Sequence, residues 1–355
     1  MRFERIKKIA VLRANALGDL ILSFPACEAL KEAYPEAEIV LLGRSSHLDF
    51  YQGLDGPIDR IISLPSSLKF DESLFDEHQG HDAVFELLQE EKFDLAVQLH
   101  GGGKFSNAFL LKIGAGFTVG ARSSDAPVLD LNIPYQQFNH EVFRQLDIVE
   151  KVGGLVKQRS PKVKVKKVNL DRARQTLIQI FKERDFLQKI VLINPGATDL
   201  KRRWPAEKFS TLGEELRKLG HKILYNIGPN EEKLIDQIKS RFHSLNDVFF
   251  ISPSLQELPG ILAQCALVIS NDTGTLHLSM ALGTPSVALF WHRNLVNYGP
   301  IASTANRVLV SWQMNCPVCQ INCCLEKCEH EASLISSIPE SQVMEAANEL
   351  LDTSL

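Results

Sequence analysis

The residues of this chain that best suit binding chemistry are small and polar and follow a short apolar run: Asp272, Thr273, Gly274, Thr275 and, one turn later, His277. The apolar run predicts a buried strand, and a short helical pattern follows the polar turn. The first N–H groups of such a helix point outward at the positive end of its dipole. Hydroxyls of the two threonines add donors, and the glycine lets a ligand approach the backbone. This pattern suits a diphosphate, although an ordinary capped turn uses the same residue types.

Another loop, which is rich in cations, follows a different predicted strand and ends at Trp204. It contains Thr198 and then the adjacent cations Lys201 and Arg202. Cations in a loop at a sheet edge suit phosphate binding, and the apolar tryptophan argues against a freely solvated turn. Further on, Glu231 follows the next strand and can accept hydrogen bonds from ribose hydroxyls. A glutamate in the first turn of a helix is the alternative interpretation of this position.

Asp19 lies near the N-terminus, in the turn between the first predicted strand and the first helix. Sheets of α/β proteins place catalytic groups at such turns, and a carboxylate there can deprotonate an acceptor hydroxyl. A helix-capping aspartate is the alternative. His100 and Lys104 enclose three glycines after the strand at residues 95–99. We take them as candidates for an acceptor site, with Lys104 on a phosphate, although a flexible turn explains the glycines equally well.

Five of the seven cysteines are crowded between Cys316 and Cys328. Cys319 and Cys323 lie between these two, and His330 follows closely. Several thiols at this spacing can close a tetrahedral zinc or iron site. Reduced thiols or a labile surface disulfide are the alternatives. We predict a structural role for the four cysteines, with the metal left open between zinc and iron.

The predicted elements that must position these residues alternate between strand and helix in both halves of the chain. This alternation predicts an α/β protein with two Rossmann-like, doubly wound domains, at residues 1–165 and 166–355. A net charge of -4 gives no case for nucleic-acid binding. No apolar run approaches the about 20 residues that span a bilayer, so we expect a cytoplasmic protein. The basic stretch at residues 157–167 is read as a charged edge strand or linker, and in a second interpretation it contacts an anionic membrane.

Together, the Ala-Leu-Gly-Asp turn at Asp19, the loop from Gly196 to Trp204 and the Asp-Thr-Gly turn with His277 resemble glycosyltransferase family 9, the lipopolysaccharide heptosyltransferases. The resemblance extends over residues 9–291 and the tail. It implies a GT-B architecture, with an acceptor-binding N-terminal domain facing a donor-binding C-terminal domain across a cleft. It also implies inverting transfer without a catalytic metal, from ADP-L-glycero-D-manno-heptose to an inner-core acceptor.

The same resemblance implies roles for individual residues. Asp19 corresponds to the proposed catalytic base, and Thr198 with Arg202, or its neighbour Lys201, to the contacts on the donor phosphate. The remaining donor-site residues are Glu231, Asp272, Thr273, Gly274, Thr275 and His277. The implied partners are a nucleotide sugar and a lipid-linked or oligosaccharide acceptor at the inner membrane. Transfer of a UDP- or TDP-hexose, a sugar-nucleotide epimerase, and a non-catalytic nucleotide-sugar-binding scaffold are the alternatives.

Overall fold

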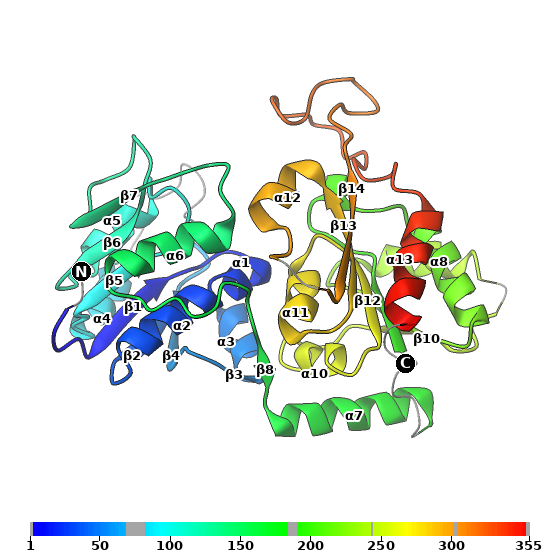
Figure 1. Ribbon diagram of the computed structural model, residues 1–355, viewed down its shortest axis with the longest axis horizontal. Coiled ribbons are helices and arrows are strands. Elements are labelled where there is room, and N and C mark those ends of the chain that lie inside the picture. Colours follow the sequence, from blue (N-terminus) through cyan, green and yellow to red (C-terminus); the bar gives the residue numbers. More distant parts are fainter. Residues whose placement is uncertain (1–2, 69–81, 184–189, 243, 302–303, 353–355) are drawn as a thin grey trace. The chain divides into compact units, whose positions relative to one another are not determined.

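The computed structural model describes residues 3–68, 82–183, 190–242, 244–301 and 304–352. The chain divides into two compact units, Met1–Pro161 and Lys162–Leu355. The division falls four residues before the boundary expected after residue 165. Each unit is an α/β sheet covered by helices (Figure 1).

The first unit is built on a six-stranded sheet of order β4-β2-β1-β5-β6-β7, in which all pairs are parallel. Its strands, with the short β3, are β1 (Lys8–Leu12), β2 (Glu38–Gly43), β3 (Leu54–Asp55), β4 (Arg60–Ser63), β5 (Leu95–Gln98), β6 (Thr118–Arg122) and β7 (Leu131–Pro134). The central strands β1, β2 and β5 are buried along nearly their whole length, as expected of a parallel sheet covered on both faces.

The helices of the first unit are α1 (Leu17–Leu22), α2 (Phe24–Ala33), α3 (Ser45–Tyr51), α4 (Asp82–Glu90), α5 (Ser106–Lys112) and α6 (Glu141–Lys151). Alternate residues of β1, such as Ala10 and Leu12, pack with Leu88 of α4 and Phe109 of α5 in one apolar cluster. Alternation of this kind follows from the two-residue period of a strand. The sequence pattern predicts one helix over residues 20–34, whereas the structure has two helices that meet at Ser23.

The second unit contains a parallel six-stranded sheet of order β11-β10-β9-β12-β13-β14. Its strands, with the short β8, are β8 (Lys164–Val165), β9 (Ile190–Asn194), β10 (Lys222–Asn226), β11 (Val248–Ile251), β12 (Leu267–Asn271), β13 (Ser286–Trp291) and β14 (Asn306–Ser311). The apolar sequence before the cationic loop predicts a strand over residues 189–194, which is confirmed as β9, except that Lys189 lies outside the described residues. The edge strand expected in the basic stretch is the two-residue β8.

Helices of the second unit are α7 (Lys167–Phe181), the single 3-10 turn η1 (Leu200–Arg202), α8 (Ala206–Lys218), α9 (Glu232–Lys239), α10 (Leu258–Leu262), α11 (Gly274–Leu282), α12 (His292–Tyr298) and α13 (Glu340–Asp352). Phe209 of α8 and Val343 of α13 pack with Val191 and Val287 on one face of the sheet. On β13, Ala288 and Phe290 instead pack with Leu276 of α11. The apolar strands are therefore buried from both sides.

The two sheets share one strand order, and this order locates their binding edges. In each sheet the strand that comes first in the chain lies in the middle: β1 lies between β2 and β5, and β9 lies between β10 and β12. The chain therefore builds the sheet outward first on one side of this strand and then on the other. Ligands of such sheets bind at this switch point, beyond the carboxyl ends of the strands. In the first unit the point lies between β1 and β5, and in the second between β9 and β12.

No transmembrane span was found among the described helices, each of which is too short or too polar to cross a bilayer.

Candidate functional site

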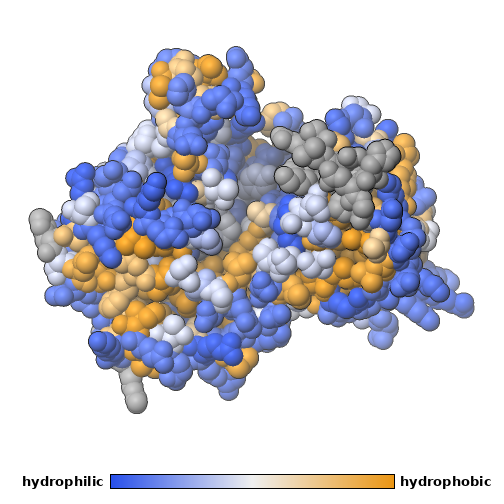
Figure 2. Space-filling model, turned by 180° about the vertical axis from the view of Figure 1, so that it is seen from behind, coloured by the Kyte–Doolittle hydropathy of each residue, from blue (hydrophilic) through white to orange (hydrophobic). Residues whose placement is uncertain are grey.

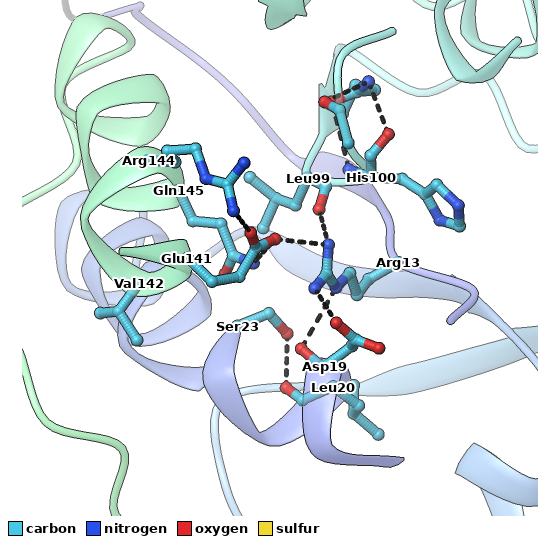
Figure 3. A network of polar contacts seen from close by, with 12 residues as sticks. Arg13, Asp19, Leu20, Ser23, Leu99, His100, Glu141, Val142, Arg144 and Gln145 are labelled. Carbon is cyan, nitrogen blue, oxygen red and sulfur yellow. Dashed lines mark hydrogen bonds and ion pairs between the residues drawn. The ribbon is translucent and has the colours of Figure 1, made fainter. Parts of the chain in front are cut away.

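Asp19 lies at the switch point of the first sheet, in the first turn of α1. Its carboxylate reaches back to the start of its own helix, where Oδ2 accepts from the backbone N–H of Ala16 at 3.2 Å. The other oxygen, Oδ1, accepts from Arg13 at 2.8 Å (Figure 3). Asp19 therefore contributes to capping, as the alternative interpretation expected. Its side chain nevertheless keeps 20% of its surface exposed, so a ligand can reach the carboxylate.

Arg13 follows β1 directly and is 1% exposed. Its guanidinium also contacts Glu141 Oε1 at 2.8 Å and donates to the carbonyl of Leu99. Glu141 in turn pairs with Arg144 through its second oxygen (Figure 3). Burial acts to raise the pKa of Glu141, but the charges of Arg13 and Arg144 outweigh it and hold that pKa below its usual range. The predictions from sequence missed this network, although an arginine directly after an apolar strand was a visible signal.

The residues proposed for the acceptor lie in different environments. His100 is buried, and its Nδ1 accepts from the N–H of Ala14 at 3.3 Å. Burial, followed by the charges of Arg13 and Arg44, lowers the pKa of His100 to about 3. The ring is therefore neutral near pH 7 and cannot meet an anionic acceptor as a cation. Lys104 remains exposed and pairs with Asp125 at 3.2 Å.

In the second unit, helix α11 begins at the switch point between β9 and β12. Thr273 precedes the first helical residue, Gly274, and the first helical hydrogen bond runs from the N–H of His277 to the carbonyl of Thr273 at 3.2 Å. The N–H groups of Gly274, Thr275 and Leu276 come before that bond, at the positive end of the dipole. The predicted strand, polar turn and helix are thus present, and residues 272–275 are called the diphosphate loop after the ligand expected from the sequence. Thr273, Gly274 and Thr275 are partly exposed.

Asp272 begins this loop, but its carboxylate is only 3% exposed. Oδ1 lies 3.3 Å from His277 Nε2, and Oδ2 lies 3.1 Å from Arg202 and 2.7 Å from the amide of Asn294 on α12. Burial acts to raise the pKa of Asp272, but the His277 contact, the charge of Arg202 and the Asn294 hydrogen bond hold it below its usual range. The carboxylate ties the cationic loop, α11 and α12 together.

Buried asparagines, which the sequence predictions missed, fix the backbone beside this helix. Asn271 accepts from the N–H of Trp204 at 3.0 Å and donates to the carbonyl of Pro195 at 2.8 Å. Asn226 donates to Asn194 at 2.8 Å, so the ends of β10 and β9 are joined as well. Each asparagine is the last residue of its strand, which is a signal the sequence already contained. The amide of Asn271 thereby satisfies backbone groups that would otherwise be buried without partners.

The cations of the loop before Trp204 point to different partners. Arg202 reaches Asp272, whereas the Nζ of Lys201 donates to the carbonyl of Cys328. Of the two adjacent cations, only Arg202 contacts the diphosphate loop among the interactions of the described residues. Trp204 is 1% exposed and anchors the loop as expected, with its indole N–H donating to Ile338 at 3.0 Å. Thr198 is exposed at the loop surface.

Glu231 precedes α9, and its carboxylate lies over the backbone of the loop that follows β9. A Cβ added to Gly196 would come within 1.9 Å of the carboxylate, so only glycine fits there without displacement. Oε1 pairs with Arg203 at 2.8 Å, and Oε2 accepts from the N–H of Gly228 at 3.0 Å. Adjacent Glu232 is exposed and lies in α9. Glu231 rather than Glu232 therefore lies at the edge of the sheet.

The cysteine loop, residues 312–333, extends outward after β14 (Figure 1). Figure 2 shows this loop from behind as a projecting lobe with mixed hydrophobic and hydrophilic side chains. Ligand atoms of Cys316, Cys319, Cys328 and His330 all lie within 4.8 Å of one another. Such a group of three thiols and one imidazole can hold a metal ion. Of the four cysteines predicted as ligands, the structure gathers three and brings His330 to them in place of Cys323.

Two further observations concern the thiols of this loop. The N–H groups of Cys319 and Val318 donate to the sulfur of Cys316 and lower the pKa of that thiol to about 6. A thiolate at neutral pH is the form that binds metals. The Sγ of Cys323 lies 3.6 Å from the carbonyl oxygen of Ile321, outside the metal-ligand group.

Comparison with known proteins connects this geometry to a family. The model of glycosyltransferase family 9 (heptosyltransferase) matches residues 82–330. A lipopolysaccharide core heptosyltransferase of Haemophilus influenzae is 22% identical over 322 residues, covering 86% of this chain and 85% of that protein. The solved structure of a family 9 glycosyl transferase from Veillonella parvula has a TM-score of 0.80 at 23% identity and covers 99% of both chains.

Two structures from Escherichia coli share the fold. ADP-heptose lipopolysaccharide heptosyltransferase II matches with a TM-score of 0.76 at 18% identity, covering 98% of this chain and 99% of that one. An iron-containing dodecameric glycosyltransferase matches with a TM-score of 0.53 at 12% identity, covering 100% of this chain and 78% of that one. The two parallel sheets described above are those of the GT-B fold. Since the family match spans 249 of 355 residues, the chain belongs to glycosyltransferase family 9 and is a heptosyltransferase-type glycosyltransferase.

Proposed function

We propose that this enzyme transfers a heptose from an ADP-activated donor to a lipopolysaccharide inner-core acceptor, with inversion at the anomeric carbon. The observation that carries the proposal is the diphosphate loop, where the start of α11 and the guanidinium of Arg202 lie together at the switch point of the second sheet. Relatives in the family support the sugar and the acceptor class, because they carry the names core heptosyltransferase and ADP-heptose heptosyltransferase.

The leaving group determines what the donor site must supply. When the bond between the sugar C1 and the diphosphate oxygen breaks, its electron pair stays on the diphosphate. We propose that the N–H groups at the start of α11, the hydroxyl of Thr275 and the charge of Arg202 meet that charge. We therefore propose that the chemical step needs no metal at the diphosphate. Glu231 is proposed to accept hydrogen bonds from the ribose.

Asp19 is proposed as the general base. Its carboxylate would take the proton of the acceptor hydroxyl while the hydroxyl oxygen attacks C1 from the face opposite the diphosphate. The partial exposure of Asp19 supports this role, since a base must reach a hydroxyl within hydrogen-bond distance. Because a lipid-linked acceptor lies at a membrane surface, the proposal places the reaction at the cytoplasmic face of the inner membrane.

A panel of nucleotide sugars tests the donor. With ADP-, UDP-, GDP- and TDP-sugars compared at equal concentration, we expect ADP-heptose to raise the thermal midpoint most, because a ligand that binds only the folded state stabilises it. At about 100 times its Kd, the expected stabilisation is about 2.7 kcal/mol. A larger shift with UDP- or TDP-hexose would replace the proposed donor. Analysis of the anomeric configuration of the transferred sugar by NMR tests inversion.

We also propose that Cys316, Cys319, Cys328 and His330 hold one structural zinc or iron ion. The donor set fits either metal, and a fold neighbour carries the description iron-containing. When bound, the metal would supply cross-links within the cysteine loop, and Lys201 would join that loop to the donor site through Cys328. Elemental analysis of reduced protein should find about one metal per chain, lost in Cys328→Ser and kept in Cys323→Ser. Metal-free wild-type protein with an unchanged melting temperature would contradict this site.

A further inference from the structure

Arg13 is buried beside Asp19 and contacts it twice. Its Nη2 donates to Oδ1 of Asp19 at 2.8 Å, and its Nε donates to the backbone carbonyl of the same residue at 3.2 Å. Both the carboxylate and the peptide group of Asp19 are therefore held by one planar guanidinium. A lysine in this position has no such fork and would hold one of the two at most.

The far side of the same guanidinium is fixed by two other elements. Nη1 contacts Glu141 Oε1, at the start of α6, at 2.8 Å and also donates to the carbonyl of Leu99, which follows β5 (Figure 3). Glu141 is itself held by Gln145 at 3.0 Å and by Arg144. Arg13 thus connects β1, β5, α6 and α1, and none of these contacts depends on a flexible surface side chain.

We propose that Arg13, supported by Glu141, is a positioning residue that holds the carboxylate of Asp19 in its reactive orientation. The inference rests on the proposed function, because it assumes that Asp19 is the base. Exposure separates the two roles: the side chains of Arg13 and Glu141 are 1% and 8% exposed, whereas that of Asp19 is 20% exposed. The support is buried, and the group it supports reaches the surface.

The contacts leave Asp19 able to accept a proton. A carboxylate offers about four lone-pair positions, and the contacts with Arg13 and Ala16 use one on each oxygen. A buried arginine between two carboxylates is also a poor way to gain stability, since desolvation opposes most of the attraction. The guanidinium of Arg13 additionally fixes the orientation of Asp19.

The molecule contains a control of similar chemistry but greater exposure at the other end of the same strands: Arg60, whose side chain is 39% exposed. Arg60 at the start of β4 also binds two carboxylates, with 2.8 Å to Glu38 and 2.6 Å to Glu91. Glu38 is the first residue of β2, so this cluster lies at the amino ends of the strands, away from the switch point. Arg60→Lys therefore removes the same type of fork without touching Asp19.

The test is a set of steady-state assays on the full-length enzyme. We expect Arg13→Lys to lower kcat about 10- to 100-fold with the KM for donor within about twofold, because misplacement of the base acts on the chemical step. Arg13→Met should lose more than Arg13→Lys, and Arg60→Lys should keep kcat within about twofold. An unchanged kcat in Arg13→Lys, or an equal loss in Arg60→Lys, would overturn the proposal.

A double variant shows whether Arg13 acts through Asp19. In the Asp19→Asn background, adding Arg13→Lys should cause no further loss of kcat, since the group it orients is already inactive. Losses that multiply would overturn the proposal. If Asp19→Asn alone keeps full kcat, the base assignment and the role of Arg13 both fail. A low kcat in Asp19→Asn with a normal kcat in Arg13→Lys removes the role of Arg13 and leaves the base assignment standing.

Glu141→Gln tests the positioning role of Arg13 even if the Arg13 variants do not fold. It preserves the size of the side chain and removes only the charge that fixes the far side of Arg13. We expect kcat to fall about threefold to tenfold with little change in the KM for donor. An unchanged kcat in folded Glu141→Gln would overturn the proposal.

Discussion

Asp19 and Asp272 both follow a strand at the switch point of their sheet, and both pair with an arginine, yet their carboxylates are used differently. Each oxygen of Asp19 accepts one hydrogen bond, and its side chain is 20% exposed. Asp272 is 3% exposed, and both of its oxygens are occupied by groups from the cationic loop, α11 and α12. The same residue type therefore presents a partly exposed carboxylate in one unit and a buried one in the other.

This difference changes the role assigned to Asp272. The family resemblance places it among the donor-binding residues, but its carboxylate is only 3% exposed and both oxygens are held by groups of the protein. We infer that it acts on the donor indirectly, by holding Arg202 and the start of α11 in place. A buried ion pair of this kind is costly to break from one side, because the remaining charge stays without its counter-charge. Burial, rather than residue type, decides which aspartate can do chemistry.

The largest expected difference between the two aspartates is in their contribution to stability. We expect Asp272→Ala to lower the free energy of unfolding by about 3–5 kcal/mol, because His277, Arg202 and Asn294 lose a shared acceptor. Asp19→Ala removes a partly exposed carboxylate and leaves Arg13 paired with Glu141, so it should cost only about 1 kcal/mol. Urea denaturation of both variants measures the difference. Equal losses would mean that the two carboxylates are anchors of the same kind.

A smaller effect concerns donor affinity and separates the two adjacent cations. Arg202→Ala should raise the Kd for ADP about 10-fold or more, since a charge-assisted hydrogen bond contributes about 1.5–3 kcal/mol. Lys201→Ala, whose side chain contacts the cysteine loop, should change that Kd by less than about threefold. Titration calorimetry with ADP gives both values. A stronger effect of Lys201→Ala would reverse the assignment.

The smallest effect is the dependence of stability on pH. The folded-state pKa of Asp272 lies below its ordinary value of 3.8, so its contribution to stability is complete above that value and is lost as the pH falls through the folded pKa. Wild type should therefore lose more stability than Asp272→Asn between about pH 4 and pH 2. Asp19→Asn serves as the comparison. Parallel pH profiles in wild type and Asp272→Asn would contradict the anchoring of this carboxylate.

Much of the fold followed from the sequence, because the buried strands are continuous apolar runs. The runs at β1, β9 and β12 predicted their strands closely, and the polar residues after them marked the binding edges. The resemblance supplied the family, and the family match confirmed it. The edge strand β7 was not predicted, because its sequence Leu-Asn-Ile-Pro lacks a continuous apolar run. The edge strand β14 was missed although it contains the apolar run Val308-Leu309-Val310.

The details of the site depended on tertiary contacts that spacing does not encode. Sequence alone could not decide which of Lys201 and Arg202 contacts the diphosphate loop, because the side chains of adjacent residues reach different neighbours. It proposed Cys323 as a ligand because its spacing fits as well as that of Cys328, whereas the chain path brings His330 to the site. The contacts of Arg13 with Leu99 and Glu141 join residues that are 86 or more positions apart in the chain. His100 is likewise buried against Ala14, which is 86 positions before it.

The comparison of Asp19 with Asp272 is tested most directly by single-turnover transfer in enzyme saturated with ADP-heptose and then mixed with acceptor. Saturation removes differences in donor affinity, so the observed rate reports the chemical step. We predict that Asp19→Asn is slower than wild type by about 10²–10⁴-fold, as expected for loss of a general base. Asp272→Asn, once saturated, should remain within about tenfold of wild type. A near-normal rate in Asp19→Asn, or an equal loss in both variants, would contradict the account.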